Sequence, residues 1–202
     1  MKEFSRVLAS QESISKRGLV FGFGVNDSAY IISKYIDGKL TLCPAYSAWF
    51  RMIKRCYCKK SLIQHPTYKG CSVSHEWRYF SNFLSWYDKN YIDGFELDKD
   101  IKVIGNKEYS KERCIYVSKA VNRLLHKTNK KKSQLAMGVV KYNASGKYLA
   151  RIGGQGAKNI GVFETEREAA EAYKREKNHL IDKAAEKNPE IAVHLLQHKH
   201  DI

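Results

Sequence analysis

The C-terminal third of the chain carries the pattern that most restricts its fold. Three short β-type runs occupy residues 138–142, 147–152 and 159–163. Two glycine-containing turns separate them. Thr165 and Glu168 then have the spacing of a capping box, and an apolar stripe with helical spacing follows until Asn188-Pro189 ends it. This order predicts three antiparallel strands covered on one face by a single helix, with the other face of the sheet open.

The charge of the chain suggests a polyanionic partner. Lys and Arg total 36 against 21 Asp and Glu, a net charge of +15 on 202 residues. Such an excess sets up a positive field that attracts nucleic acid. The alternative is a basic surface that only keeps the protein soluble. RNA is the weaker nucleic-acid candidate, because base-stacking motifs are not evident.

The N-terminus and the cysteines suggest a reduced compartment. Residues 1–18 contain no sustained apolar block, so we expect no signal peptide and no membrane partner. We expect a cytoplasmic protein. Five cysteines, an odd number, argue against a disulfide framework. A zinc site is one alternative, with these candidate ligands: Cys43, Cys56, Cys58, Cys71 and His75. We favour the other, in which Cys43, Cys56, Cys71 and Cys114 are small buried side chains, and expect no zinc site.

Two aromatic helices are expected between residues 44 and 90. Pro44 suits a first helical position, and aromatic side chains then recur every three to four residues up to Tyr57. Arg51 and Arg55 occupy the other side, which either follows phosphates or is simply solvated. A second aromatic stripe follows Ser74, and we expect both stripes to form the core.

A polar segment lies at the centre of the chain. Leu97-Asp98-Lys99-Asp100 is followed by a Gly105-Asn106 turn, a β-type run at 114–117 and a short helix that contains Asn122. Two strands that lead into a helix can bring Asp98, Lys99 and Asn122 together. We therefore treat Asp98, Lys99, Asp100 and Asn122 as candidate catalytic residues.

These patterns predict an α+β protein with four segments. The segments are an N-terminal arm with short strands (1–43), a hairpin-helix domain (44–126), a basic linker (127–135) and the sheet-and-helix domain (136–202). Lys130, Lys131 and Lys132 in the linker are expected to contact phosphates without sequence preference.

The sheet of the last segment is the predicted site of base recognition. Its candidate outward residues are Lys141, Tyr142, Lys147, Tyr148 and Arg151. A sheet studded with cations can enter the major groove of double-stranded DNA, where Arg pairs with guanine through two hydrogen bonds.

The residues from Gly138 to about Ala185 resemble the ethylene-response-factor type of DNA-binding domain, which is also found in mobile endonucleases. The shared string is Gly138-Val139, Tyr148-x-Ala150-Arg151-Ile152, Ile160-Gly161-x-Phe163-x-Thr165 and Ala169-Ala170-x-Ala172-Tyr173. The resemblance implies that the sheet lies in the major groove.

The upstream segment resembles phage HNH-type homing endonucleases, a ββα-metal fold. The matching residues run from Trp49-x-x-Met52-x-x-Arg55-Cys56 through Glu76-Trp77 to Leu97-Asp98-Lys99-Asp100 and Tyr109-Ser110. This resemblance implies a divalent cation, Mg²⁺ or Mn²⁺, on Asp98 and Asn122. It places Lys99 where the family has its catalytic His, and Arg113 where the family has a structural Asn.

Lysine at the His position weakens the catalytic expectation. A protonated ammonium beside Asp98 and Asp100 is a poor base and is better suited to a phosphate. Asp100, His126 and His75 are the alternative bases.

We therefore expect a double-stranded DNA-binding protein of phage or mobile-element type, in which Lys99 and Arg113 also contact phosphates. The alternatives are an active Mg-dependent endonuclease and an effector that binds an acidic protein.

Overall fold

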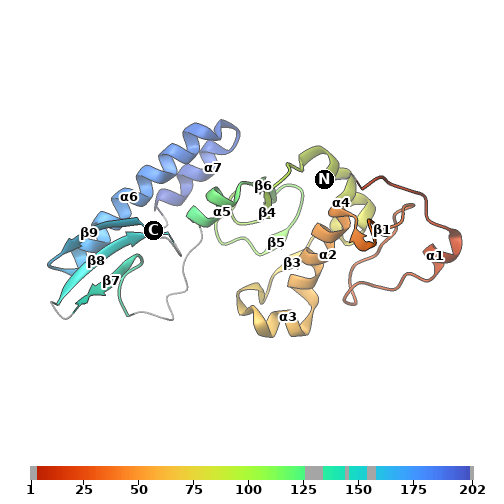
Figure 1. Cartoon of the computed structure of the whole chain (residues 1–202), viewed down its shortest axis with the longest axis horizontal. Helices are drawn as coiled ribbons and strands as arrows, with labels where there is room; N and C mark the ends of the chain where they lie inside the picture. Colours follow the sequence, from red (N-terminus) through yellow and green to blue (C-terminus); the bar gives the residue numbers. More distant parts are fainter. Residues whose placement is uncertain (1–3, 126–133, 144–145, 154–157, 201–202) are drawn as a thin grey trace. The chain divides into compact units, whose positions relative to one another are not determined.

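The computed structural model describes residues 4–125, 134–143, 146–153 and 158–200. The chain divides into two units, Met1–Tyr116 and Val117–Ile202 (Figure 1). The division lies ahead of the basic linker expected at 127–135, and most of that linker is outside the described residues. The mixed α+β class and the three-stranded antiparallel sheet expected from the sequence are confirmed.

Within the described residues, the first unit contains four α-helices and six short strands, the last of which ends at Val117, the first residue of the second unit. The helices are α1 (Gln11–Ser15), α2 (Pro44–Tyr57), α3 (Lys59–Gln64) and α4 (Phe80–Asn90). The strands are β1 (Ser33–Ile36), β2 (Lys39–Leu42), β3 (Ser72–Val73), β4 (Glu96–Asp98), β5 (Glu108–Tyr109) and β6 (Ile115–Val117). Each strand pairs with one other: β1 with β2, β3 with β5 in parallel, and β4 with β6.

Aromatic side chains form the core of the first unit. Helix α2 begins at Pro44 as predicted, and its buried stripe packs against that of α4. Trp49 and Trp77 are fully buried, and the Trp49 indole N–H donates to the Trp77 carbonyl at 2.8 Å. The aromatic stripes are therefore core, as expected. The Ser74 hydroxyl accepts a hydrogen bond from the Trp77 N–H of the 3₁₀ turn Glu76–Arg78, whereas α4 begins only at Phe80, five residues later than a cap at Ser74 would place it.

In the part of the second unit that the structure describes, there are one three-stranded sheet and three α-helices. Its strands β7 (Val139–Tyr142), β8 (Lys147–Ile152) and β9 (Lys158–Phe163) pair antiparallel in chain order. Its helices are α5 (Lys119–Leu125), α6 (Glu166–Lys187) and α7 (Ala192–Gln197). The capping box of Thr165 and Glu168 is present at the start of α6. Helix α7, which the sequence pattern did not predict, packs on α6 and buries Leu195.

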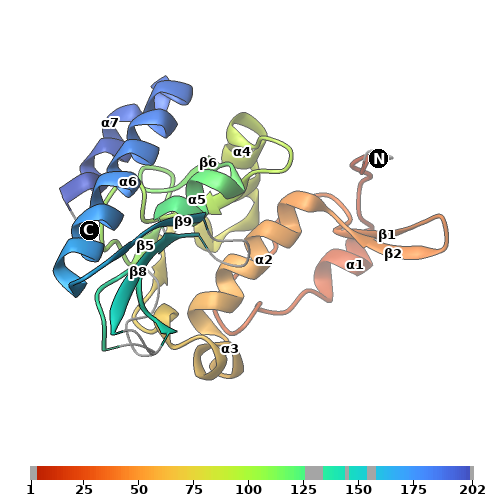
Figure 2. The same cartoon turned by 60° about the vertical axis from the view of Figure 1, so that its left-hand side comes forward.

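Helix α6 covers one face of the β7–β9 sheet. Figures 1 and 2 show α6 along one side of these strands, and it contacts all three. Val139 and Ala150 are buried against Ala169 and Ala172 of the helix. Gly138 has a φ of +77°, and a Cβ there would lie 2.0 Å from the Tyr173 ring. Tyr173 therefore packs directly on the backbone at the start of the sheet.

No helix in the portion of the chain that the structure describes is both long enough and apolar enough to cross a bilayer.

Candidate functional site

Asp98 holds the backbone of the turn that follows β4. Its Oδ1 accepts hydrogen bonds from the backbone N–H groups of Asp100, at 2.7 Å, and Ile101, at 2.8 Å. Burial raises the pKa of this carboxyl above its ordinary value, although the two N–H groups act in the opposite direction. These contacts give Asp98 a structural use at the centre of the predicted catalytic segment.

The Lys99 side chain points into the protein. It is 6% exposed, and its Nζ donates to Asp100 Oδ1 at 2.6 Å and to the Asn106 carbonyl at 2.9 Å. Nζ also lies 5.8 Å from the centre of the Tyr109 ring. This use differs from the phosphate contact expected from the sequence, because the ammonium is already surrounded by acceptors of its own segment.

Asn106 is the residue that connects this segment, and the sequence interpretation missed it. Its amide nitrogen donates to the Lys99 carbonyl at 2.8 Å and to the Glu108 carbonyl at 2.6 Å. Its Oδ1 accepts from the Glu108 backbone N–H at 3.1 Å and from Arg113 Nη1 at 2.9 Å. The sequence signal was present, since Gly105-Asn106 marked a turn, but a turn residue need not be buried. We call Asp98, Lys99, Asp100, Asn106 and Arg113 the Asn106 network.

The Asn106 network does not fit a divalent cation. Asp98 Oδ1 already accepts two amides, and Asp100 Oδ1 is bonded to an ammonium. Across the described ranges, no group of three or more His, Cys, Asp and Glu side chains is arranged to hold a metal ion. Asn122, the second ligand implied by the resemblance, lies on α5 in the other unit.

The alternative bases are no closer to a catalytic arrangement. Asp100 belongs to the ion pair with Lys99. His75 is exposed, with its ring centre 6.0 Å from that of Tyr79. His126 lies outside the described residues.

All five cysteines are free thiols, and four of them are buried. The buried four are those expected to be small apolar side chains: Cys43, Cys56, Cys71 and Cys114. Burial raises the pKa of Cys56 and of Cys114 to about 12. Cys58, between α2 and α3, is the one cysteine that is not buried.

The open face of the β7–β9 sheet is the second candidate site. In an antiparallel sheet, directly paired residues share a face and neighbours along a strand alternate. Tyr142 pairs with Lys147, and Arg151 lies four residues after Lys147 on β8, so it points to the same face as Lys147. Since Ala150 faces the helix, these three side chains lie on the face that α6 does not cover. Exposed Val162 and half-buried Leu149 lie between them on the same face.

Two of the expected outward residues lie on the other face. Tyr148 packs against the core between sheet and helix, and Lys141 pairs directly with Tyr148. The prediction that Lys141 and Tyr148 face outward with Arg151 is therefore wrong in register, because residues one apart on a strand point to opposite faces. The open face keeps Tyr142, Lys147 and Arg151.

The charges of the open face are partly compensated. Lys147 forms an ion pair with Glu164 at 2.6 Å. Arg151 is exposed, and no carboxylate of the described residues forms an ion pair with it. Arg151 is consequently the strongest single candidate for contact with an anionic partner on this sheet.

The remaining predicted phosphate contacts have different surroundings. Arg51 is exposed on α2, whereas the half-buried Arg55 guanidinium lies 5.6 Å from the centre of the Tyr68 ring. Arg113 is part of the Asn106 network and lies 3.5 Å from Glu108 Oε2. Lys130, Lys131 and Lys132 lie outside the described residues.

Comparison with family models, with curated proteins and with solved structures gave no match in any of the three.

Proposed function

We propose that the chain is a double-stranded DNA-binding protein that recognises base edges with the open face of the β7–β9 sheet. The observation that carries the proposal is that face itself, where α6 covers one side only and Arg151, Lys147 and Tyr142 lie on the other. The major groove admits a two-stranded β-ribbon, and Arg is the side chain that most often reads guanine. The net charge of +15 supplies the long-range attraction.

The resemblance to ethylene-response-factor domains supports the same proposal. It covers the strands and α6, and it predicts their order as three strands followed by one helix. The resemblance to HNH endonucleases supports a mobile-element or phage setting for the protein.

Of the two nucleic-acid functions, we propose the non-catalytic one. The contacts of Asp98 and Lys99 within the Asn106 network support it, because they assign structural uses to the residues that hydrolysis would need. Supercoiled plasmid incubated with the protein and Mg²⁺ or Mn²⁺ should remain intact. Cutting that disappears in Asp98→Ala, in a variant that remains folded, would establish the endonuclease instead.

The test of the proposal is a binding measurement on two kinds of DNA. A preferred duplex is selected from a randomised pool, and its affinity is compared with that of a random duplex by fluorescence anisotropy. Arg151→Ala should reduce the preference for the selected duplex by about 1 to 3 kcal/mol, or roughly 5- to 150-fold. Absence of any duplex binding at low salt would refute the proposal.

A matched variant tests the face assignment. Lys141→Ala removes one positive charge from the neighbouring strand, on the side that faces α6. It should weaken the selected and random duplexes by the same factor, since it reads no base. A loss of preference as large as that of Arg151→Ala would show that the open face is not the reading surface.

A further inference from the structure

The segment from Gly38 to His75 contains no Asp or Glu but seven Lys and Arg. It includes α2 and α3, which contact each other. The chain as a whole carries 21 acidic residues, and none of them falls in this segment. The segment lies entirely in the first unit, whereas the sheet proposed to read DNA belongs to the second unit.

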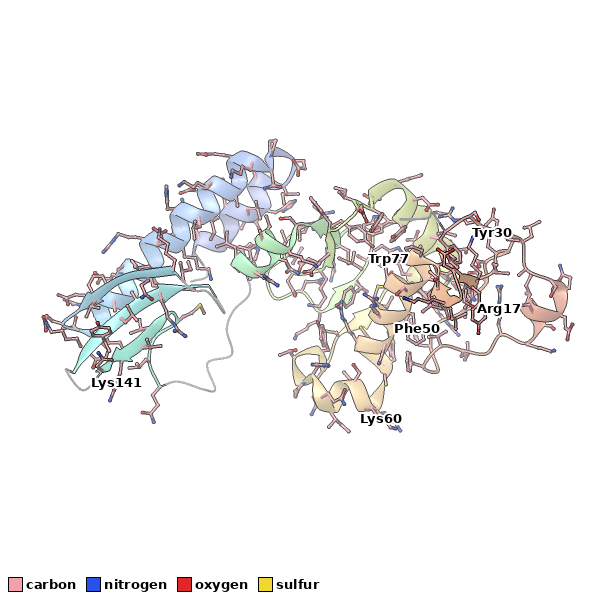
Figure 3. The ribbon with its side chains drawn as sticks, in the orientation of Figure 1. Arg17, Tyr30, Phe50, Lys60, Trp77 and Lys141 are labelled. Carbon is pink, nitrogen blue, oxygen red and sulfur yellow. The ribbon has the colours of Figure 1, made fainter. Side chains whose placement is uncertain are left out.

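Four of these cations are exposed on the two helices. Helix α2 buries its aromatic stripe in the core, and this leaves Arg51 and Lys54 on the solvent side, one turn apart. Only Cys58 separates the end of α2 from the start of α3, and Lys59 and Lys60 are exposed in the first turn of α3. Figure 3 shows the Lys60 side chain at the outer edge of α3. We call Arg51, Lys54, Lys59 and Lys60 the α2–α3 cationic surface.

The four cations lack the neutralisation that several other surface cations of the described residues have. Lys111 pairs with Glu76, Lys147 with Glu164 and Lys199 with Asp182. Within the described residues, no carboxylate forms an ion pair with any of the four. Arg51 and Lys54 lie three residues apart on α2, where like charges repel slightly, so an external anion near them would relieve the repulsion.

We infer that the α2–α3 cationic surface binds the phosphate backbone of double-stranded DNA, as a contact that does not depend on sequence. The inference rests on the proposed DNA-binding function and adds a second contact from the other unit. Backbone contacts by Lys and Arg fix a protein on the duplex without carrying sequence information. Each phosphate that a cation neutralises releases counterions, and this makes the contribution visible in the salt dependence of binding.

Two double variants test the inference in the full-length protein. Arg51→Gln with Lys54→Gln, and Lys59→Gln with Lys60→Gln, each remove two positive charges from exposed positions and keep good helix formers. Each should lower the slope of log affinity against log salt concentration by about 1 to 2, because one phosphate contact contributes about 0.9. The affinities for selected and random duplexes should fall by the same factor.

The matched control removes the same charge from a different helix. Lys183→Gln with Lys187→Gln changes two exposed lysines on α6 outside both proposed surfaces, and it should leave the salt slope within about 0.5 of the unchanged protein. An equal fall in the control would overturn the inference, since net charge alone would then explain the effect. Circular dichroism and thermal unfolding of every variant establish that the fold is intact.

The outcomes separate this inference from the proposed function. If the unchanged protein binds duplex DNA and Arg151→Ala reduces its preference, but both α2–α3 variants keep the full salt slope, the α2–α3 inference fails and the function stands. If duplex RNA of equal length competes as well as DNA for this surface, the assignment to DNA is overturned. If nothing binds, the proposed function fails first.

Discussion

Replacement of Asn106 by Ala should destabilise the first unit strongly. The side chain makes four hydrogen bonds in a buried position, to the Lys99 and Glu108 carbonyls, the Glu108 N–H and Arg113. A net hydrogen bond contributes about 1 kcal/mol, and a buried group left without a partner costs about 1 to 3 kcal/mol. Some of the freed groups at the edge of the site regain water, so we expect a loss of about 3 kcal/mol in the free energy of unfolding.

Urea unfolding followed by tryptophan fluorescence measures this loss directly. All three tryptophans, Trp49, Trp77 and Trp86, belong to the first unit, so the signal reports that unit alone. The matched control is Asn90→Ala, which removes one exposed hydrogen bond to the Trp86 carbonyl and should change stability by less than about 0.5 kcal/mol. A loss below about 1 kcal/mol for Asn106→Ala would refute the assignment of a structural role to the network.

Three further changes test other parts of the structure. Gly138→Ala should cost about 2 kcal/mol or more in a circular-dichroism melt, because its Cβ meets the Tyr173 ring; Gly146→Ala, with a similar positive φ but open space, should cost less. Burial raises the pKa of Asp98 above its ordinary 3.8, so the folded state favours the protonated form and stability should fall as pH rises from about 3.8 through the folded-state pKa. Asp98→Asn keeps an acceptor oxygen and should flatten that fall in urea titrations at several pH values. Thr165→Ala removes the capping box of α6 and should cost about 1 kcal/mol by thermal unfolding.

Elements specified by local chemistry were predictable from the sequence. Pro44 marks the start of α2, and Thr165 with Glu168 marks the start of α6. Both signals lie within four residues of the helix end that they specify, so no knowledge of the rest of the fold is needed. The order of β7, β8 and β9 was predictable for the same reason, since short turns join antiparallel neighbours.

Pairing across long stretches of sequence was not predictable. Strand β3 pairs in parallel with β5, 36 positions later at Ser72 and Glu108. Each of these strands has only two residues, so neither shows a periodic pattern. The face taken by Tyr148 was missed for a different reason. The expected outward set placed Tyr148 with its strand neighbour Lys147, although neighbours on a strand point to opposite faces, and the position of α6 then decides which face is buried.

The candidate catalytic segment shows a limit of reading motifs. Leu97-Asp98-Lys99-Asp100 has the polar composition of an active site, yet its carboxylates and ammonium bond mostly within their own turn. The same residue types can form hydrogen bonds within a buried loop or with a substrate. Only the direction of each side chain distinguishes the two cases. On the open sheet face, by contrast, Arg151 was identified correctly as exposed.

The position of Cys58 makes the native protein convenient to label at a single site. The other four thiols are buried, which shields them from alkylating dyes. Burial also raises the pKa of Cys56 and Cys114 to about 12, so these two thiols are almost entirely protonated at neutral pH. A maleimide fluorophore should therefore attach to Cys58 alone, next to Lys59 at the junction of α2 and α3. A single-site optical probe thus lies beside the α2–α3 cationic surface without any engineered cysteine.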